Sequence, residues 1–135
     1  MPDFTKLWDY EYIFGPNPID MTRSDWVFLY AATAGVVIAI IIKIFVWRTE
    51  QGNPRRFFLN RLFHLFFTIG LLALLWAGFR YENIPWLSTH FVVLAIILIG
   101  LIWAAYIAKF AIIEFPGQRR VWEDQKIKMK YLASR

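Results

Sequence analysis

The sequence of 135 residues contains no cysteine. Without thiols the chain cannot form disulfides, thiolate metal sites or cysteine nucleophiles. Acidic residues are also scarce, ten against fifteen lysines and arginines, and none interrupts the long apolar runs. No HExxH, GxSxG, Walker or GxGxxG pattern occurs. We therefore expect no enzymatic activity, no bound metal and no cofactor.

Apolar blocks dominate what is present, since 59% of the residues are hydrophobic. Each block is about 20 residues long, enough to cross a hydrocarbon core of roughly 30 Å. The expected fold is an all-α integral membrane protein with a single domain, 1–135, and three transmembrane helices in an up-down bundle. These helices are expected at 24–50, 54–80 and 88–114.

Local signals place the helix ends. Gly52 is a natural helix terminator, and Asn53 before Pro54 is typical of a helix start, so the first two helices should be antiparallel neighbours. The third should stop at Pro116 and Gly117, because proline removes a backbone donor and crowds the preceding turn. The expected N-caps are Thr22 or Ser24 for the first helix and Ser88 or Thr89 for the third.

The N-terminal residues 1–23 form an acidic arm rich in aromatic residues. Phe4, Leu7, Trp8 and Tyr12 follow helical spacing. Aromatic side chains of this kind favour the membrane–water interface. The arm therefore either lies flat on the bilayer or packs irregularly against the helix ends.

The C-terminal residues 118–133 predict an amphipathic helix with a basic face. Such a helix suits an anionic leaflet or a groove on a partner protein; the alternative is a solvated helix. The residues expected to dock on lipid headgroups or a partner are Arg119, Arg120, Trp122, Lys126 and Lys130.

Charge is sorted along the chain. Residues 1–25 carry a net charge of −3, whereas residues 48–61 and 114–135 each carry +3. Lysine and arginine accumulate on the cytoplasmic side of membrane proteins. We therefore expect the N terminus outside and the C terminus in the cytoplasm, in a prokaryotic plasma membrane. This sorting is typical of membrane topology, so nucleic acid is not an expected partner.

Small residues recur at every fourth position on two of the expected helices. Such spacing lets helix backbones approach closely and favours association within a membrane. The alternative is that these rows arise by chance, since alanine and glycine are common in membrane helices. The first row is Ala31, Gly35 and Ala39; the second is Gly100, Ala104 and Ala108.

A polar row follows the same spacing on the second helix: Arg56, Asn60, His64 and Thr68. An ionisable residue within a membrane helix is a candidate for function; the alternative is a neutral, structurally bonded histidine. We expect His64 to face protein or water, with Tyr106 as a candidate partner and Phe66 and Leu62 nearer the lipid. Glu114 is expected to pair with Arg61 or Lys43.

The leading hypothesis is a small non-enzymatic membrane protein that acts through helix–helix association. Its partners would be the lipid bilayer and either further copies of itself, in a homo-oligomer, or a membrane complex that it joins as a scaffold or accessory subunit. The alternative is a homo-oligomeric channel or transporter whose path is lined by the second helix.

Overall fold

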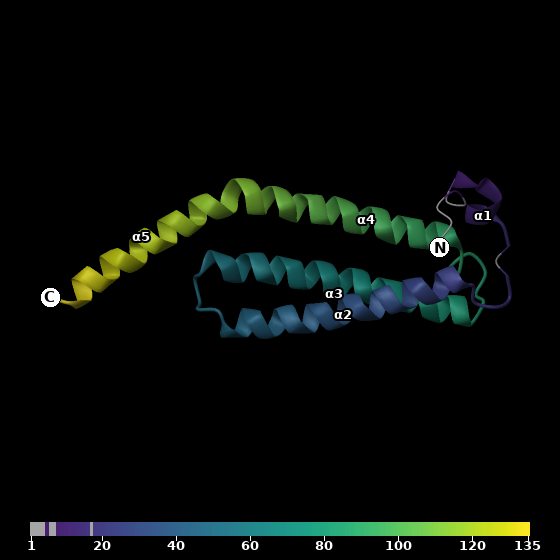
Figure 1. The fold of residues 1–135 in the computed structure, drawn as a ribbon, viewed down its shortest axis with the longest axis horizontal. Coiled ribbons are helices and arrows are strands. Elements are labelled where there is room, and N and C mark those ends of the chain that lie inside the picture. Colours follow the sequence, from purple (N-terminus) through teal and green to yellow (C-terminus); the bar gives the residue numbers. More distant parts are fainter. Residues whose placement is uncertain (1–4, 6–7, 17) are drawn as a thin grey trace.

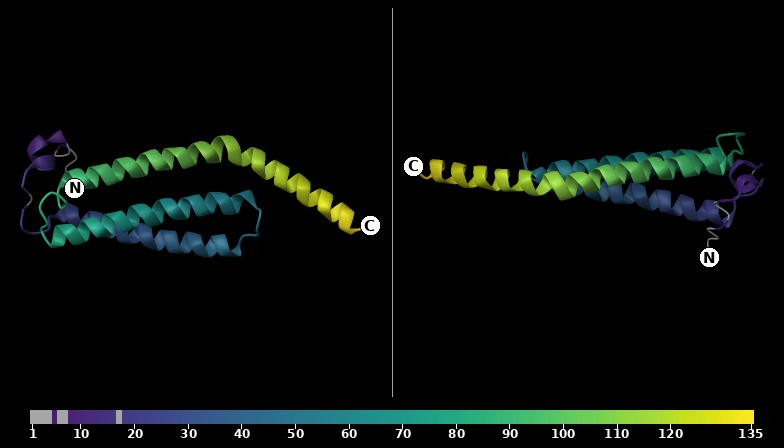
Figure 2. Two further views of the ribbon diagram at one scale, coloured as in Figure 1. Left: turned by 180° about the vertical axis from the view of Figure 1, so that it is seen from behind. Right: turned by 90° about the horizontal axis from the view of Figure 1, so that it is seen from above.

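The computed structural model describes residues 5, 8–16 and 18–135. It places α2 and α3 side by side and antiparallel, while α4 starts beside them and then diverges (Figures 1 and 2). Three helices are long and apolar enough to cross a membrane: α2, α3, and the continuous helix from His90 to Ala133. The elements are α1 (Tyr10–Phe14), α2 (Arg23–Arg48), α3 (Pro54–Tyr81), α4 (His90–Lys109), the π-helical segment η2 (Phe110–Glu114) and α5 (Phe115–Ala133).

The starts of α2 and α3 follow their local signals. Thr22 forms a capping box with Asp25, in which each side chain bonds the backbone N–H of the other residue. Asn53 caps α3 by accepting a hydrogen bond from the N–H of Arg55, and Pro54 lies in its first turn. In the arm, α1 ends before Gly15. Of the expected face, Phe4 and Leu7 lie outside the described residues, Trp8 is exposed and Tyr12 is half-buried within α1.

The seam between α2 and α3 repeats every seven residues along α2. Seven residues is the interval of a left-handed helix pair. On α3, Gly70 lies against this seam: a Cβ atom there would be 2.8 Å from the Val36 side chain and 3.3 Å from the Ala32 carbonyl oxygen. The two backbones approach closely because Gly70 has no side chain. The buried residues of α2 are Asp25, Ala32, Ala39 and Val46.

Trp76 holds the start of α4 against the α2–α3 pair. Its side chain is buried, and its indole N–H donates a hydrogen bond to the Thr89 carbonyl oxygen at 3.2 Å. Its ring meets Phe28 edge-on, with centroids 5.2 Å apart, and Ala77 and Ile96 complete this core. Thr89 occupies the N-cap position of α4, but its hydroxyl donates to the Trp86 carbonyl and does not cap the helix.

The expected end of the third helix at Pro116 and Gly117 is wrong, because the chain remains helical to Ala133. Within η2, the N–H of Phe115 bonds the carbonyl oxygen of Phe110, five residues earlier. This wider turn shifts the hydrogen-bond register just before the proline. Pro116 thus falls in the first turn of α5, where its missing N–H is tolerated.

Glycine-to-alanine substitutions test the α2–α3 seam. Gly70→Ala should lower the free energy of unfolding by about 1–3 kcal/mol, because the new methyl group meets packed atoms. Gly78→Ala is the matched control on the same helix, since a Cβ there meets nothing within 4 Å. Thermal unfolding of the purified chain in mild detergent measures both, and equal stability of the two variants would contradict the close approach.

Candidate functional sites

A group of charged and polar side chains, of which Asp25 and Arg80 are buried, lies at the end of the molecule that carries the N-terminal arm. Arg80 is fully buried, and its Nε donates to Oδ2 of Asp25 at 3.1 Å. Its Nη1 donates to Oδ1 of Asn83 at 2.9 Å, and its Nη2 donates to the carbonyl oxygens of Pro18 and Asp20 at 2.9 and 3.0 Å. We call Asp25, Arg80, Asn83 and His90 the arginine cluster.

The ends of α2 and α3 position this cluster. Asp25 is fixed by the capping box at the start of α2. Asn83 follows the end of α3 with a φ of 51°, a left-handed conformation that asparagine tolerates better than most residues. Its side-chain amide also donates to the Ile19 carbonyl oxygen at 3.1 Å. The cluster therefore ties the arm to both helices.

His90 brings the start of α4 to the same cluster. Its Nε2 lies 3.6 Å from Oδ1 of Asp25, and both ring nitrogens are buried without a hydrogen-bond partner. The ring of Tyr12 stacks on the imidazole with centroids 4.4 Å apart. The Arg80 guanidinium pairs directly with Asp25, and His90 lies beside the same carboxylate. These contacts are suited to holding the starts of α2 and α4 against the end of α3.

The sequence interpretation missed the Asp25–Arg80 pair. Asp25 lies 23 residues before the end of α2, and Arg80 lies 26 residues after the start of α3. Similar distances from a short turn place the two residues at nearly the same level, which is the signal that could have found the pair.

The polar row on α3 lies partly on the outer surface of the chain. Arg56, Asn60 and Thr68 are half-buried, whereas His64 is exposed, and its ring lies in a T-shaped arrangement with the Phe63 ring, with centroids 5.2 Å apart. Tyr106 is 73% exposed, and the structure shows no hydrogen bond between it and His64 among the described residues. Phe66, which was expected nearer the lipid than this row, is half-buried and lines a groove towards α2 and α4; which side faces lipid stays a prediction.

The expected pairing of Glu114 is also wrong. Glu114 is exposed, and no ion pair to it forms within the described residues. The Arg61 guanidinium instead lies 4.0 Å from the centroid of the Phe110 ring, and the Lys43 ammonium lies 4.6 Å from that of Phe63. Each of these two cations therefore lies over a neighbouring aromatic ring rather than beside Glu114.

The two small-residue rows reach the same groove but do not interlock. Ala31 and Gly35 of α2 and Gly100 and Ala104 of α4 line one apolar groove of about 380 Å³. The third member of each row lies elsewhere. Ala39 is buried in the α2–α3 seam, and Ala108 is exposed.

The residues of the expected docking face lie along an almost entirely exposed α5. Lys126 donates to Glu50, beside the α2–α3 turn, at 2.9 Å and also lies 4.7 Å from the centroid of the Trp122 ring. Arg119 pairs with Glu123 at 3.0 Å, while Arg120 and Lys130 are exposed. The structure thus brings part of this face to the α2–α3 turn.

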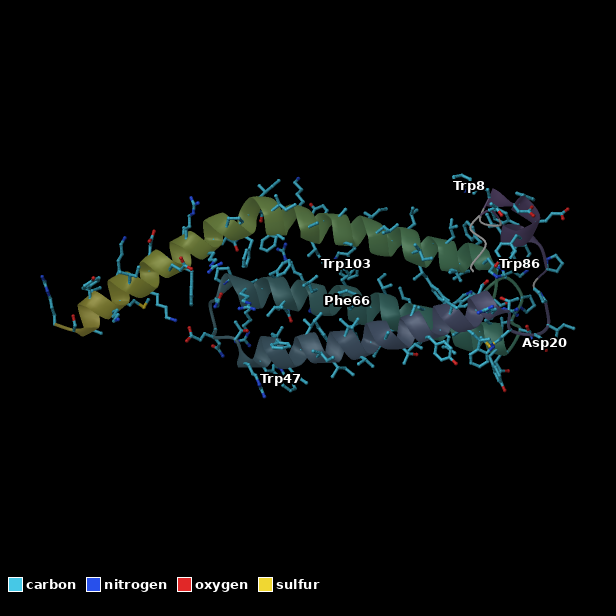
Figure 3. All side chains as sticks on the ribbon, viewed as in Figure 1. Trp8, Asp20, Trp47, Phe66, Trp86 and Trp103 are labelled. Carbon is cyan, nitrogen blue, oxygen red and sulfur yellow. The ribbon has the colours of Figure 1, made fainter. Side chains whose placement is uncertain are left out.

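Aromatic side chains lie towards both ends of the α2–α3 pair. Trp8 and Asp20 of the N-terminal arm lie at one end together with Trp86, and Trp47 lies near the α2–α3 turn (Figure 3). Tryptophan concentrates at the two membrane–water interfaces. In the described part of the chain, no three histidine or acidic residues gather as metal ligands would.

Comparison of the chain with protein-family models, with curated proteins and with solved structures found no match. The function must therefore be inferred from the geometry of the chain itself.

The arginine cluster yields a stability prediction. Arg80→Gln should lower the free energy of unfolding by about 3–5 kcal/mol, because it leaves the Asp25 carboxylate buried without its partner. Arg119→Gln removes an exposed ion pair instead and should cost at most about 1 kcal/mol. Thermal unfolding in mild detergent compares them; if both variants are equally stable, the cluster does not hold the helix ends.

Proposed function

We propose that this protein is a non-enzymatic integral membrane subunit that acts by binding another transmembrane helix. The bound helix belongs either to a second copy, in a homo-oligomer, or to a larger complex in which the chain is a scaffold or accessory subunit. The observation that carries this proposal is the apolar groove between α4 and the α2–α3 pair.

The lining of the groove favours a helix as its occupant. It combines small residues with larger apolar ones and contains no charged side chain. In a bilayer, helices associate through close packing, which small residues allow. At Gly35 an added Cβ would have only the Phe66 carbonyl oxygen near it, at 4.0 Å, so side chains of an approaching helix have room there.

The position of the groove also supports this proposal. Trp76 and Ile96 close it at the end that carries the arm, and α4 then diverges from α3 towards η2 (Figure 2). No segment among the described residues fills the space. An acyl chain is the competing occupant, and the association state distinguishes the two.

Two adjacent alanines on α4 test this proposal. Ala104 lines the groove, whereas Ala105 is exposed outside it. We expect Ala104→Ile to reduce self-association, or to release a copurifying membrane protein, because the added side chain occupies the space of the incoming helix. Ala105→Ile makes the same chemical change at nearly the same depth and should leave assembly intact.

The measurement is the mass of the assembly in mild detergent, by sedimentation and by cross-linking in membranes. A wild-type chain that is monomeric and without a protein partner would overturn the proposal. So would equal assembly of the Ala104→Ile and Ala105→Ile variants.

The exposed His64 supports a second candidate, a homo-oligomeric channel or transporter. An imidazole that faces hydrocarbon without a partner costs several kcal/mol, so a neighbouring protomer or water should cover His64. In that case α3 contributes its polar row to a path between protomers.

Flux through proteoliposomes tests this candidate. If His64 lines a path, His64→Gln should change the rate of flux without changing the mass of the assembly. Thr33→Val is a control on α2, because the Thr33 hydroxyl is already bonded to the Leu29 carbonyl oxygen. Absence of flux by the wild-type assembly would exclude the channel and leave association as the function.

A further inference from the structure

A polar hollow of about 320 Å³ lies between α2 and α3 near their connecting turn. It shares no residue with the apolar groove, so the two sites can be altered by separate substitutions. Two cations, Lys43 from α2 and Arg56 from α3, line it together with the amide of Asn60. The remaining lining residues are Val46, Trp47, Gln51, Gly52 and Phe57.

Among the described residues, no acidic side chain balances the charge of this hollow, although the Lys43 ammonium also lies over the Phe63 ring at 4.6 Å from its centroid. Neither Lys43 nor Arg56 forms an ion pair within the described residues. Glu50 is the only acidic residue between Trp26 and Tyr81, and its carboxylate accepts a hydrogen bond from Lys126 of α5. Two half-buried cations therefore face a cavity whose lining contains no anion.

The depth of the hollow fits the headgroup layer of a membrane. Lys43 lies five residues before the end of α2, which is about 7.5 Å of helix. Its stem can lie along apolar surface while the ammonium reaches the polar layer. Trp47 and Phe57 are 73% and 64% exposed beside the hollow, as aromatic residues at an interface often are.

We propose that this hollow binds the phosphate headgroup of an anionic phospholipid. Lys43 and Arg56 contact the phosphate, and the Asn60 amide donates a hydrogen bond to a phosphate or ester oxygen. Trp47 and Phe57 flank the glycerol region. Basic pockets between membrane helices on the cytoplasmic side bind anionic headgroups in this way, and the predicted topology places this turn on that side.

A lipid-binding titration of the full-length chain tests the proposal. The wild-type chain in mild neutral detergent is titrated with phosphatidylglycerol or phosphatidylcholine, and the bound lipid is measured by native mass spectrometry. We expect phosphatidylglycerol to bind more tightly. Lys43→Gln and Arg56→Gln should each weaken its binding about fivefold, the effect of one basic residue near an anionic headgroup.

Arg55→Gln is the matched control. Arg55 is the exposed neighbour of Arg56 but does not line the hollow, so its loss should leave binding of phosphatidylglycerol within twofold. Lys43→Arg keeps the charge and should retain binding. If Arg55→Gln weakens binding as much as Arg56→Gln does, the lipid recognises a diffuse basic surface and the proposal is overturned.

A second arm separates lipid from free phosphate. Inorganic phosphate is added at increasing concentration while binding of phosphatidylglycerol is followed. We expect millimolar phosphate to displace little lipid, because it gains no contact with Trp47 and Phe57. Displacement by inorganic phosphate at the concentrations that phosphatidylglycerol itself requires would overturn the lipid assignment, as would equal affinity for phosphatidylcholine.

Discussion

The close packing of α2 on α3 is the constraint on which the other features depend. Lipid chains are as apolar as the helix surfaces, so burial alone gives these helices little reason to associate. Ala32 and Gly70 let the backbones meet, and dispersion contacts then accumulate along the seam. A short turn closes one end of the pair. At the other end of the pair, Arg80 and Asp25 bind each other, and this ion pair replaces the water that would otherwise solvate the two groups.

The path of α4 gives the molecule one closed and one open end. Trp76 and the arginine cluster hold the start of α4 close to the α2–α3 pair. Towards η2 the helix departs, and α5 bends back until Lys126 reaches Glu50 (Figure 1). The groove proposed for a partner helix is the space left by this divergence. The same bend brings a cation to Glu50, so the carboxylate nearest the polar hollow in sequence is already engaged.

The sequence predicted those features that are decided locally. Apolar blocks gave three helices of membrane-spanning length, and Asn53 with Pro54 placed the start of α3. The bundle arrangement and the orientation in a membrane stay predictions. The Asp25–Arg80 pair could not be predicted from the residues of either helix alone, because it depends on the register between the two helices. For the same reason, the sequence did not identify Gly70 as the glycine at which α3 approaches the backbone of α2. The continuation of the helix through Pro116 depends on the π-helical turn before it.

The polar row on α3 shows why spacing alone does not define one site. A step of four residues turns an α-helix by about 40° beyond a full turn, so the first and last of four such residues point about 120° apart. Arg56 and Asn60 accordingly share the hollow beside α2, while His64 has already rotated onto the exposed surface. One chain cannot direct all four side chains into one narrow path. The row instead divides into Arg56 and Asn60, which line the hollow proposed for a phosphate headgroup, and the exposed His64 farther from the turn.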